Sequence, residues 1–167
     1  MLSMHAVSVP VYARMLTNLS AILDKAAAFA ETKKIEPKVL LDMRLAPDMF
    51  PLTRQVQIAC DFAKGSVARL AGQEPPKWED NEASIADLKA RIARTIEFLQ
   101  GFQAADIDAG AQRQITLQVR GETKVVAAQP YLLTMAMPNF YFHVTTAYAI
   151  LRHAGVDIGK RDFIGAI

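Results

Sequence analysis

Four long stretches of the chain carry apolar side chains at spacings of three and four residues. This spacing is typical of helices that bury one face and expose the other. The stripes predict helices over about residues 8–32, 51–72, 84–101 and 130–154. Four amphipathic helices with one apolar stripe each predict an all-α four-helix bundle.

Local signals refine this pattern at three places. Ser84 with Asp87 three residues later is typical of a helix start, because each side chain can accept a hydrogen bond from a free amide. Pro138 removes an internal hydrogen bond, so we expect the last helix to be kinked or restarted near it. Apolar and polar residues alternate over 114–126 around a glycine-containing turn, which predicts a small β-hairpin before the last helix.

Length and composition favour one globular domain spanning residues 1–167. The 167 residues are 51% hydrophobic and 22% charged, which is enough apolar material for a sizeable core. Interspersed charges with a formal net charge of +2 do not form the basic stripe that nucleic-acid binding requires. We therefore expect no nucleic-acid partner.

Two further observations bear on location. Cys60 is the single cysteine and cannot form an internal disulfide, and the first residues lack the pattern of a secretory signal, so we expect a cytoplasmic protein. The apolar window 130–151 is long enough to span a membrane, but Pro138, His143 and several threonines interrupt it. We interpret it as a core helix and expect no membrane association.

His143 is the main candidate for chemistry. It shares a face of the predicted last helix with Asn139, Ala147 and Ile150, and therefore points to the core. It can be a neutral core histidine that is hydrogen-bonded across the bundle, since buried polar groups need partners. Alternatively, it lines a pocket between helices as a ligand or general base.

Three other residues are candidates for the same pocket. Asp48 and Arg44 precede the second helix, where Asp48 can cap the helix start and pair with Arg44, or can reach the mouth of the bundle and hold His143. Cys60 lies on the apolar stripe of the second helix, where we expect a buried, unactivated thiol.

Three stretches together resemble a known family: "RLAPDMFPLTRQVQIACDFAKGSVARLAG" (44–72), "PNFYFHVTTAYAILRHAGVDIGK" (138–160) and "LSAILDKA" (19–26). The chain is similar to an uncharacterised domain-of-unknown-function family within the DinB/YfiT-like superfamily of metalloenzymes. This resemblance implies an up-down-down-up four-helix bundle that is often a dimer, so we expect a homodimer.

Members of that superfamily hold nickel or zinc with one histidine on the second helix and an HxxxH pair on the last. Only His143 matches one of these ligands, because Ala147 or Asn139 takes the partner position and the second helix offers Gln57, Cys60 or Asp61. We therefore expect no metal cofactor.

The resulting hypothesis is a metal-free binding or regulatory module for an unknown small molecule, with a polar pocket around His143, Asn139 and Asp48. The alternative hypothesis is an enzyme, a degenerate metal- or thiol-dependent transferase or isomerase. It would use His143 with Asp48, Cys60 or His5.

Overall fold

The chain is mostly helical and carries one small antiparallel hairpin, as its sequence pattern predicts. The computed structural model describes residues 3–119 and 121–166. In chain order, the elements are α1 (Met4–Lys33), α2 (Pro37–Asp42), α3 (Leu52–Leu70), α4 (Ile85–Gln100), α5 (Ala104–Asp108), the 3-10 turn η1 (Ala109–Gln112), β1 (Gln114–Val119), β2 (Glu122–Ala127), α6 (Ala128–Pro130), the π-helical turn η2 (Tyr131–Ala136), α7 (Met137–His153) and α8 (Lys160–Ile164).

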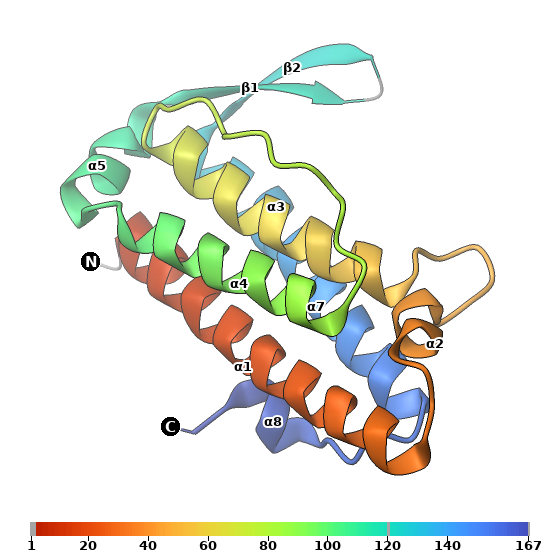
Figure 1. Ribbon diagram of the computed structural model, residues 1–167. Helices are drawn as coiled ribbons and strands as arrows, with labels where there is room; N and C mark the ends of the chain where they lie inside the picture. The colour runs from red at the N-terminus through yellow and green to blue at the C-terminus, as the bar shows by residue number, and fades with distance from the viewer. Residues whose placement is uncertain (1–2, 120, 167) are drawn as a thin grey trace.

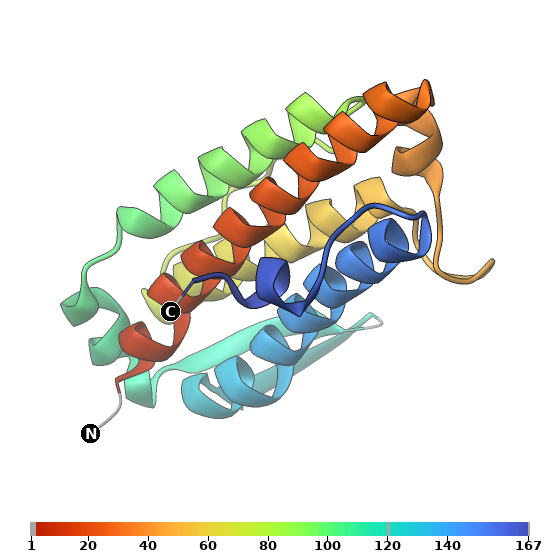
Figure 2. The same cartoon turned by 90° about the horizontal axis from the view of Figure 1, so that it is seen from below.

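The long helices α1, α3, α4 and α7 lie side by side, with α1 and α7 running one way and α3 and α4 the other (Figure 1). Helix α1 contacts α4 and α7, and α3 contacts the same two helices, so the four enclose a common core. Figure 2 shows the C-terminal α8 lying across α1, which it contacts. The hairpin pairs Gln114 with Ala127 and Val119 with Glu122.

Helices α3 and α4 run in the same direction, so a long connection must join them. The segment 71–84 runs back beside α3 before α4 begins (Figure 1). The segment ends at Ser84, the predicted cap of α4. The Ser84 hydroxyl accepts a hydrogen bond from the Asp87 amide at 3.1 Å, and the Asp87 carboxylate accepts one from the Ala83 amide at 3.1 Å. The prediction of the helix start at Ser84 is confirmed.

Helix boundaries differ from the predicted ones at both ends of the chain. Helix α1 begins one turn early because Ser3 caps it, accepting the Ala6 amide at 3.1 Å. The last helix begins slightly early, at Ala128, and runs through α6, η2 and α7 without a break. Pro138 lies in the first turn of α7, where the helix changes from π to α geometry.

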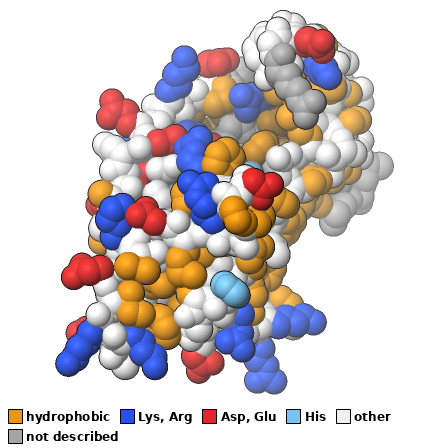
Figure 3. Space-filling view, turned by 90° about the vertical axis from the view of Figure 1, so that its right-hand side faces the viewer, with side chains coloured by type: hydrophobic (Ala, Val, Ile, Leu, Met, Phe, Trp, Pro, Cys, Tyr) orange, Lys and Arg blue, Asp and Glu red, His pale blue; other side chains and the backbone are white. Residues whose placement is uncertain are grey.

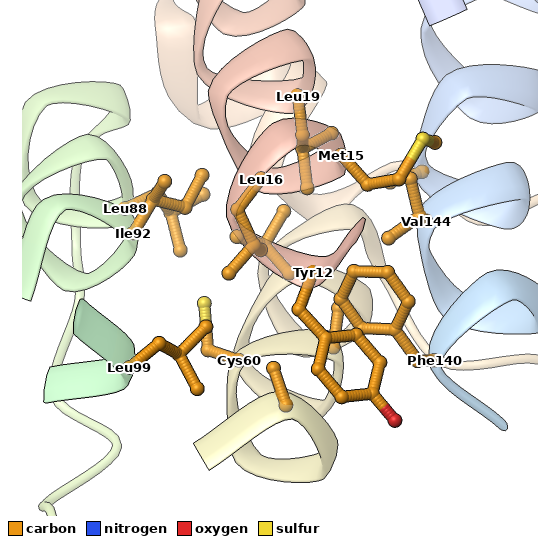
Figure 4. Packing of buried hydrophobic residues seen from close by; sticks show 14 of the residues in the cluster. Tyr12, Met15, Leu16, Leu19, Cys60, Leu88, Ile92, Leu99, Phe140 and Val144 are labelled. Atoms are coloured by element: carbon orange, nitrogen blue, oxygen red, sulfur yellow. The ribbon is translucent and has the colours of Figure 1, made fainter. Parts of the chain in front are cut away.

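The core is built from the apolar stripes that the sequence predicts. Tyr12 on α1 packs edge-on against Phe140 on α7, with ring centroids 4.6 Å apart. Leucines and isoleucines of α1 and α4 continue the core beside them (Figure 4). The largest fully buried side chains are Tyr12, Phe140, Leu16, Leu19, Ile22, Leu23, Leu40, Leu52, Leu70, Leu88, Ile92 and Leu99.

Within the described residues, α1 is the one helix that is long and apolar enough to cross a membrane. Its apolar side chains Tyr12, Leu16 and Leu19 are fully buried against the other helices. A core helix of a soluble protein passes the same test, so the hydropathy of α1 is weak evidence for a membrane span.

Candidate functional site

His143 joins α7 to α3 through a buried hydrogen bond. Its Nδ1 lies 2.7 Å from Oε1 of Gln55, which is in the first turns of α3. Only 8% of His143 and 1% of Gln55 is exposed. The far end of the Gln55 amide is also held, because its Nε2 donates to the Phe50 carbonyl at 3.0 Å.

These two bonds fix the tautomer of the imidazole. A carbonyl can only accept, so Gln55 must present its NH₂ group to Phe50 and its oxygen to His143. The His143 Nδ1 therefore carries the proton and donates it to Gln55. In the neutral ring, Nε2 is then left as a hydrogen-bond acceptor, base or ligand atom.

Burial and the nearby Arg54 favour the neutral form of this imidazole, which is flanked by aromatic rings. Phe62 stacks on His143 with ring centroids 6.1 Å apart, and Phe142 meets it edge-on at 5.2 Å. Burial lowers the pKa of His143 below its ordinary value of 6.5, and the positive charge of Arg54 lowers that pKa further. The arrangement is a neutral acceptor in an apolar surrounding, suited to a hydrogen-bonding or proton-accepting role.

Asn139 is near His143 in sequence but serves its own helix. Its Nδ2 donates to the Met135 carbonyl at 2.7 Å. That carbonyl belongs to η2, where the helix changes from π to α geometry. Among the described residues, the structure gives Asn139 a role at this junction and no hydrogen bond to His143.

Asp48 and Arg44 lie exposed in the loop between α2 and α3. The prediction that Asp48 caps α3 and pairs with Arg44 is wrong: the N-cap is Pro51, no side chain caps it, and Arg44 donates to the Met49 carbonyl. Within this loop, Arg44 is therefore held by a backbone carbonyl and not by the Asp48 carboxylate. Within residues 3–119 and 121–166, no hydrogen bond or ion pair joins Asp48 to His143.

Cys60 is fully buried on α3, and burial raises the pKa of its thiol to about 12. A protonated thiol without access to solvent is a poor nucleophile and a poor metal ligand. His5 lies half-buried in the first turn of α1, where its backbone amide donates to Asp108 at 2.9 Å. Neither residue hydrogen-bonds to His143 in the part of the chain that the structure describes.

The superfamily's metal requires converging ligands, and the residues around His143 do not fit it. Nδ1 of the ring is engaged by an amide, and two phenylalanine rings pack against the imidazole. Within 3–119 and 121–166, no three His, Cys, Asp or Glu side chains lie close enough together to hold a metal ion. One imidazole nitrogen is too small a donor set for a stable transition-metal site.

Sequence reasoning missed Gln55, although a signal for it exists. Gln55 falls on the buried stripe of α3, between Leu52 and Ala59, where a polar side chain needs a partner across the core. The prediction weighed Gln57, Cys60 and Asp61 as the helix positions opposite His143. Gln57 instead donates to Glu82 at 2.7 Å.

A buried arginine was also missed. The Arg91 side chain on α4 is 2% exposed and lies 2.9 Å from each of three carboxylates, namely those of Asp61, Asp80 and Glu82. Two of these carboxylates belong to the segment 71–84. Arg91 thereby fastens that segment to α3 and α4, next to Trp78, whose ring lies 4.2 Å from both Lys64 and Arg94.

Comparisons with known proteins agree with the resemblance in the sequence. A family model described as domain of unknown function DUF1993 matches residues 4–164. A crystal structure of a DinB family member protein from Shewanella denitrificans is 50% identical, with a TM-score of 0.92, and the match covers 98% of this chain and 92% of that one. No curated protein matches the chain. The chain belongs to the DUF1993 family of uncharacterised, DinB-like proteins.

Proposed function

We propose that this protein is a metal-free binding or regulatory protein for a small molecule, built on an up-down-down-up four-helix bundle. One observation carries the proposal: Gln55 holds the proton of His143 on Nδ1, so that Nε2 is the acceptor of the neutral ring, and aromatic rings lie on two sides. Holding an imidazole so that Nε2 is the acceptor prepares it for a hydrogen-bond donor on a ligand. A purely structural histidine needs only the bond to Gln55.

Nε2 makes no hydrogen bond among the described residues, and the only fully buried side-chain N or O atom without a partner there is Arg91 Nε. Nε2 is therefore not sealed from solvent, and a ligand donor can replace water at this atom. The phenylalanine rings of Phe62 and Phe142 offer apolar contact to the body of such a ligand.

His143→Asn separates the structural hydrogen bond of Nδ1 from the proposed ligand contact of Nε2. The Asn amide can stand in for Nδ1 and donate to Gln55, but it has no atom at the position of Nε2. We expect a melting temperature near that of the wild type and, for fragments with a donor and an aromatic body, binding weaker by about tenfold or more. Protein-detected NMR of a fragment library on both proteins measures this.

The same variant has an expected pH signature. The folded-state pKa of His143 is lowered, so the unfolded chain binds the proton more readily than the folded one. The contribution of neutral His143 to the free energy of unfolding is complete above the ordinary pKa of 6.5. It is lost as the pH falls through the lower pKa of the folded state. His143→Asn should lose less stability than the wild type over this acidic range.

Fragments that bind His143→Asn as tightly as the wild type would contradict the proposal that Nε2 of His143 binds a ligand.

We further propose that two copies of the chain associate. Large apolar side chains reach the surface around the loop before α3 and on α7, and Figure 3 shows hydrophobic patches between charged groups on the face of the molecule at this end. Exposed large hydrophobic residues include Val39, Leu45, Phe50 and Phe142. Light scattering should give the mass of two chains. The mass of a single chain at micromolar concentration would contradict the proposed dimer.

A further inference from the structure

A groove lies between the hairpin and the helices. Strand β1, the C-terminal half of α3, η2 and the start of the segment 71–84 line a volume of about 590 Å³. In both ribbon views, the hairpin extends beside these elements (Figures 1 and 2). The groove is lined chiefly by Phe62, Arg69, Arg113, Ile115, Tyr131 and Met135.

The two arginines of this groove differ from most other cations on α3 and α4. Arg54, Lys64 and Arg91 all pair with carboxylates. Arg69 instead donates to the Tyr131 hydroxyl at 3.4 Å, and Arg113 donates to the Leu70 carbonyl. No ion pair among the described residues includes Arg69 or Arg113.

A glycine makes room for the Arg69 head group. Gly65 lies one turn before Arg69 in the middle of α3, where glycine costs about 1 kcal/mol relative to alanine. A Cβ added at Gly65 would lie 2.8 Å from Nη1 of Arg69. The guanidinium therefore lies against the backbone of α3, with Tyr131 as its only hydrogen-bond partner among the described residues.

The other lining residues indicate which kind of ligand the groove can hold. Ile115 and Leu117 turn their buried side chains from β1 toward the helices, and Phe62 and Met135 face the same groove. Glu74 is its one acidic lining residue, so the two arginines leave a surplus of one positive charge. An anion with one charge and an apolar body matches this lining better than a dianion.

We propose that the groove binds small monoanionic organic acids, with the carboxylate on Arg69 and the Tyr131 hydroxyl and the apolar body against Phe62 and the inner face of β1. An arginine fork and a carboxylate form charge-assisted hydrogen bonds in matched geometry. Phe62 also stacks on His143, so this inference deepens the proposed function and rests on it for the link to His143.

Benzoate and benzamide test the inference, because they have nearly the same shape and differ in charge. We expect benzoate to shift NMR signals of Ile115, Leu117 and Met135, and benzamide to bind about tenfold more weakly. Arg69→Ala should remove this preference for benzoate, whereas Arg152→Ala, an exposed arginine of α7, should retain it. No shift of the groove signals up to the solubility limit of benzoate overturns the inference.

Gly65→Ala is the sharper variant because it leaves every charge in place. The new methyl group should displace the Arg69 head group, weaken benzoate binding severalfold and leave the melting temperature equal or higher. Unchanged benzoate binding in both Gly65→Ala and Arg69→Ala overturns the inference. If Gly65→Ala and Arg69→Ala lose binding and His143→Asn does not, the result supports the anion site in the groove and contradicts the proposed role of His143. If only His143→Asn loses binding, the result contradicts the anion site and leaves the role of His143 in place.

Discussion

Arg91→Ala should destabilise the protein by about 3 kcal/mol, because it removes the buried cation that three carboxylates share. Asp61 and Asp80 keep Lys64 and Arg54, but Glu82 loses its one ion-pair partner among the described residues. Glu82 is the most affected partner, since its side chain is only 9% exposed. Arg91 also donates to the Glu79 carbonyl at 3.0 Å, so the segment 71–84 loses several attachments at once. Urea denaturation measures the loss of unfolding free energy, and amide hydrogen exchange shows whether residues 73–84 open first.

Arg94→Ala provides the matched control. Arg94 lies one turn along α4, is exposed, and stacks on the face of Trp78 without an ion pair among the described residues. Its loss should cost about 1 kcal/mol or less. Equal stability losses in the two variants would show that the buried charge network does not hold the segment in place.

Phe140→Ala should cost about 3 to 5 kcal/mol, because it empties the fully buried contact between α1 and α7. The ring packs edge-on against Tyr12 and also against Tyr141, whose centroid lies 5.6 Å away. Figure 4 shows the Phe140 and Tyr12 rings together at the centre of the core. Chemical denaturation with unchanged slope against denaturant would report a loss of stability alone.

Phe142→Ala is the control on the same helix. Its side chain is 54% exposed, so we expect a loss of less than about 1 kcal/mol. A large loss in Phe142→Ala with a small one in Phe140→Ala would place the core on the wrong face of α7. It would also contradict the proposed contact of Phe142 with a ligand near His143.

The sequence predicted elements well wherever the signal is local. The Ser84 cap and the hairpin each depend on residues a few positions apart, and the structure confirms both. The irregularity near Pro138 takes the form of a change from π to α geometry within a continuous helix. The helix positions follow from the same short-range periodicity. Local signals also predicted that His143 points inward, where it is buried.

The partners of buried polar groups were not predictable in the same way. The bond from His143 to Gln55 spans 88 residues, and the bond from Arg91 to Asp61 spans 30. Which residues meet depends on the rotation and offset of each helix against its neighbour, and a stripe of apolar residues leaves both loosely defined. Asp48 was assigned to the site from its place before α3, but the loop holds it in solvent.

The parallel direction of α3 and α4 sets a lower limit on the length of the segment between them. Helix α3 has 19 residues and is therefore about 28 Å long, a distance that the chain must retrace before α4 begins. A fully extended chain advances at most about 3.5 Å per residue, so about eight residues are the minimum. The segment from Ala71 to Ser84 exceeds this minimum by about six residues, which provide the bends that bring Trp78, Asp80 and Glu82 to their partners. Larger deletions in this segment can therefore occur only together with a shorter α3.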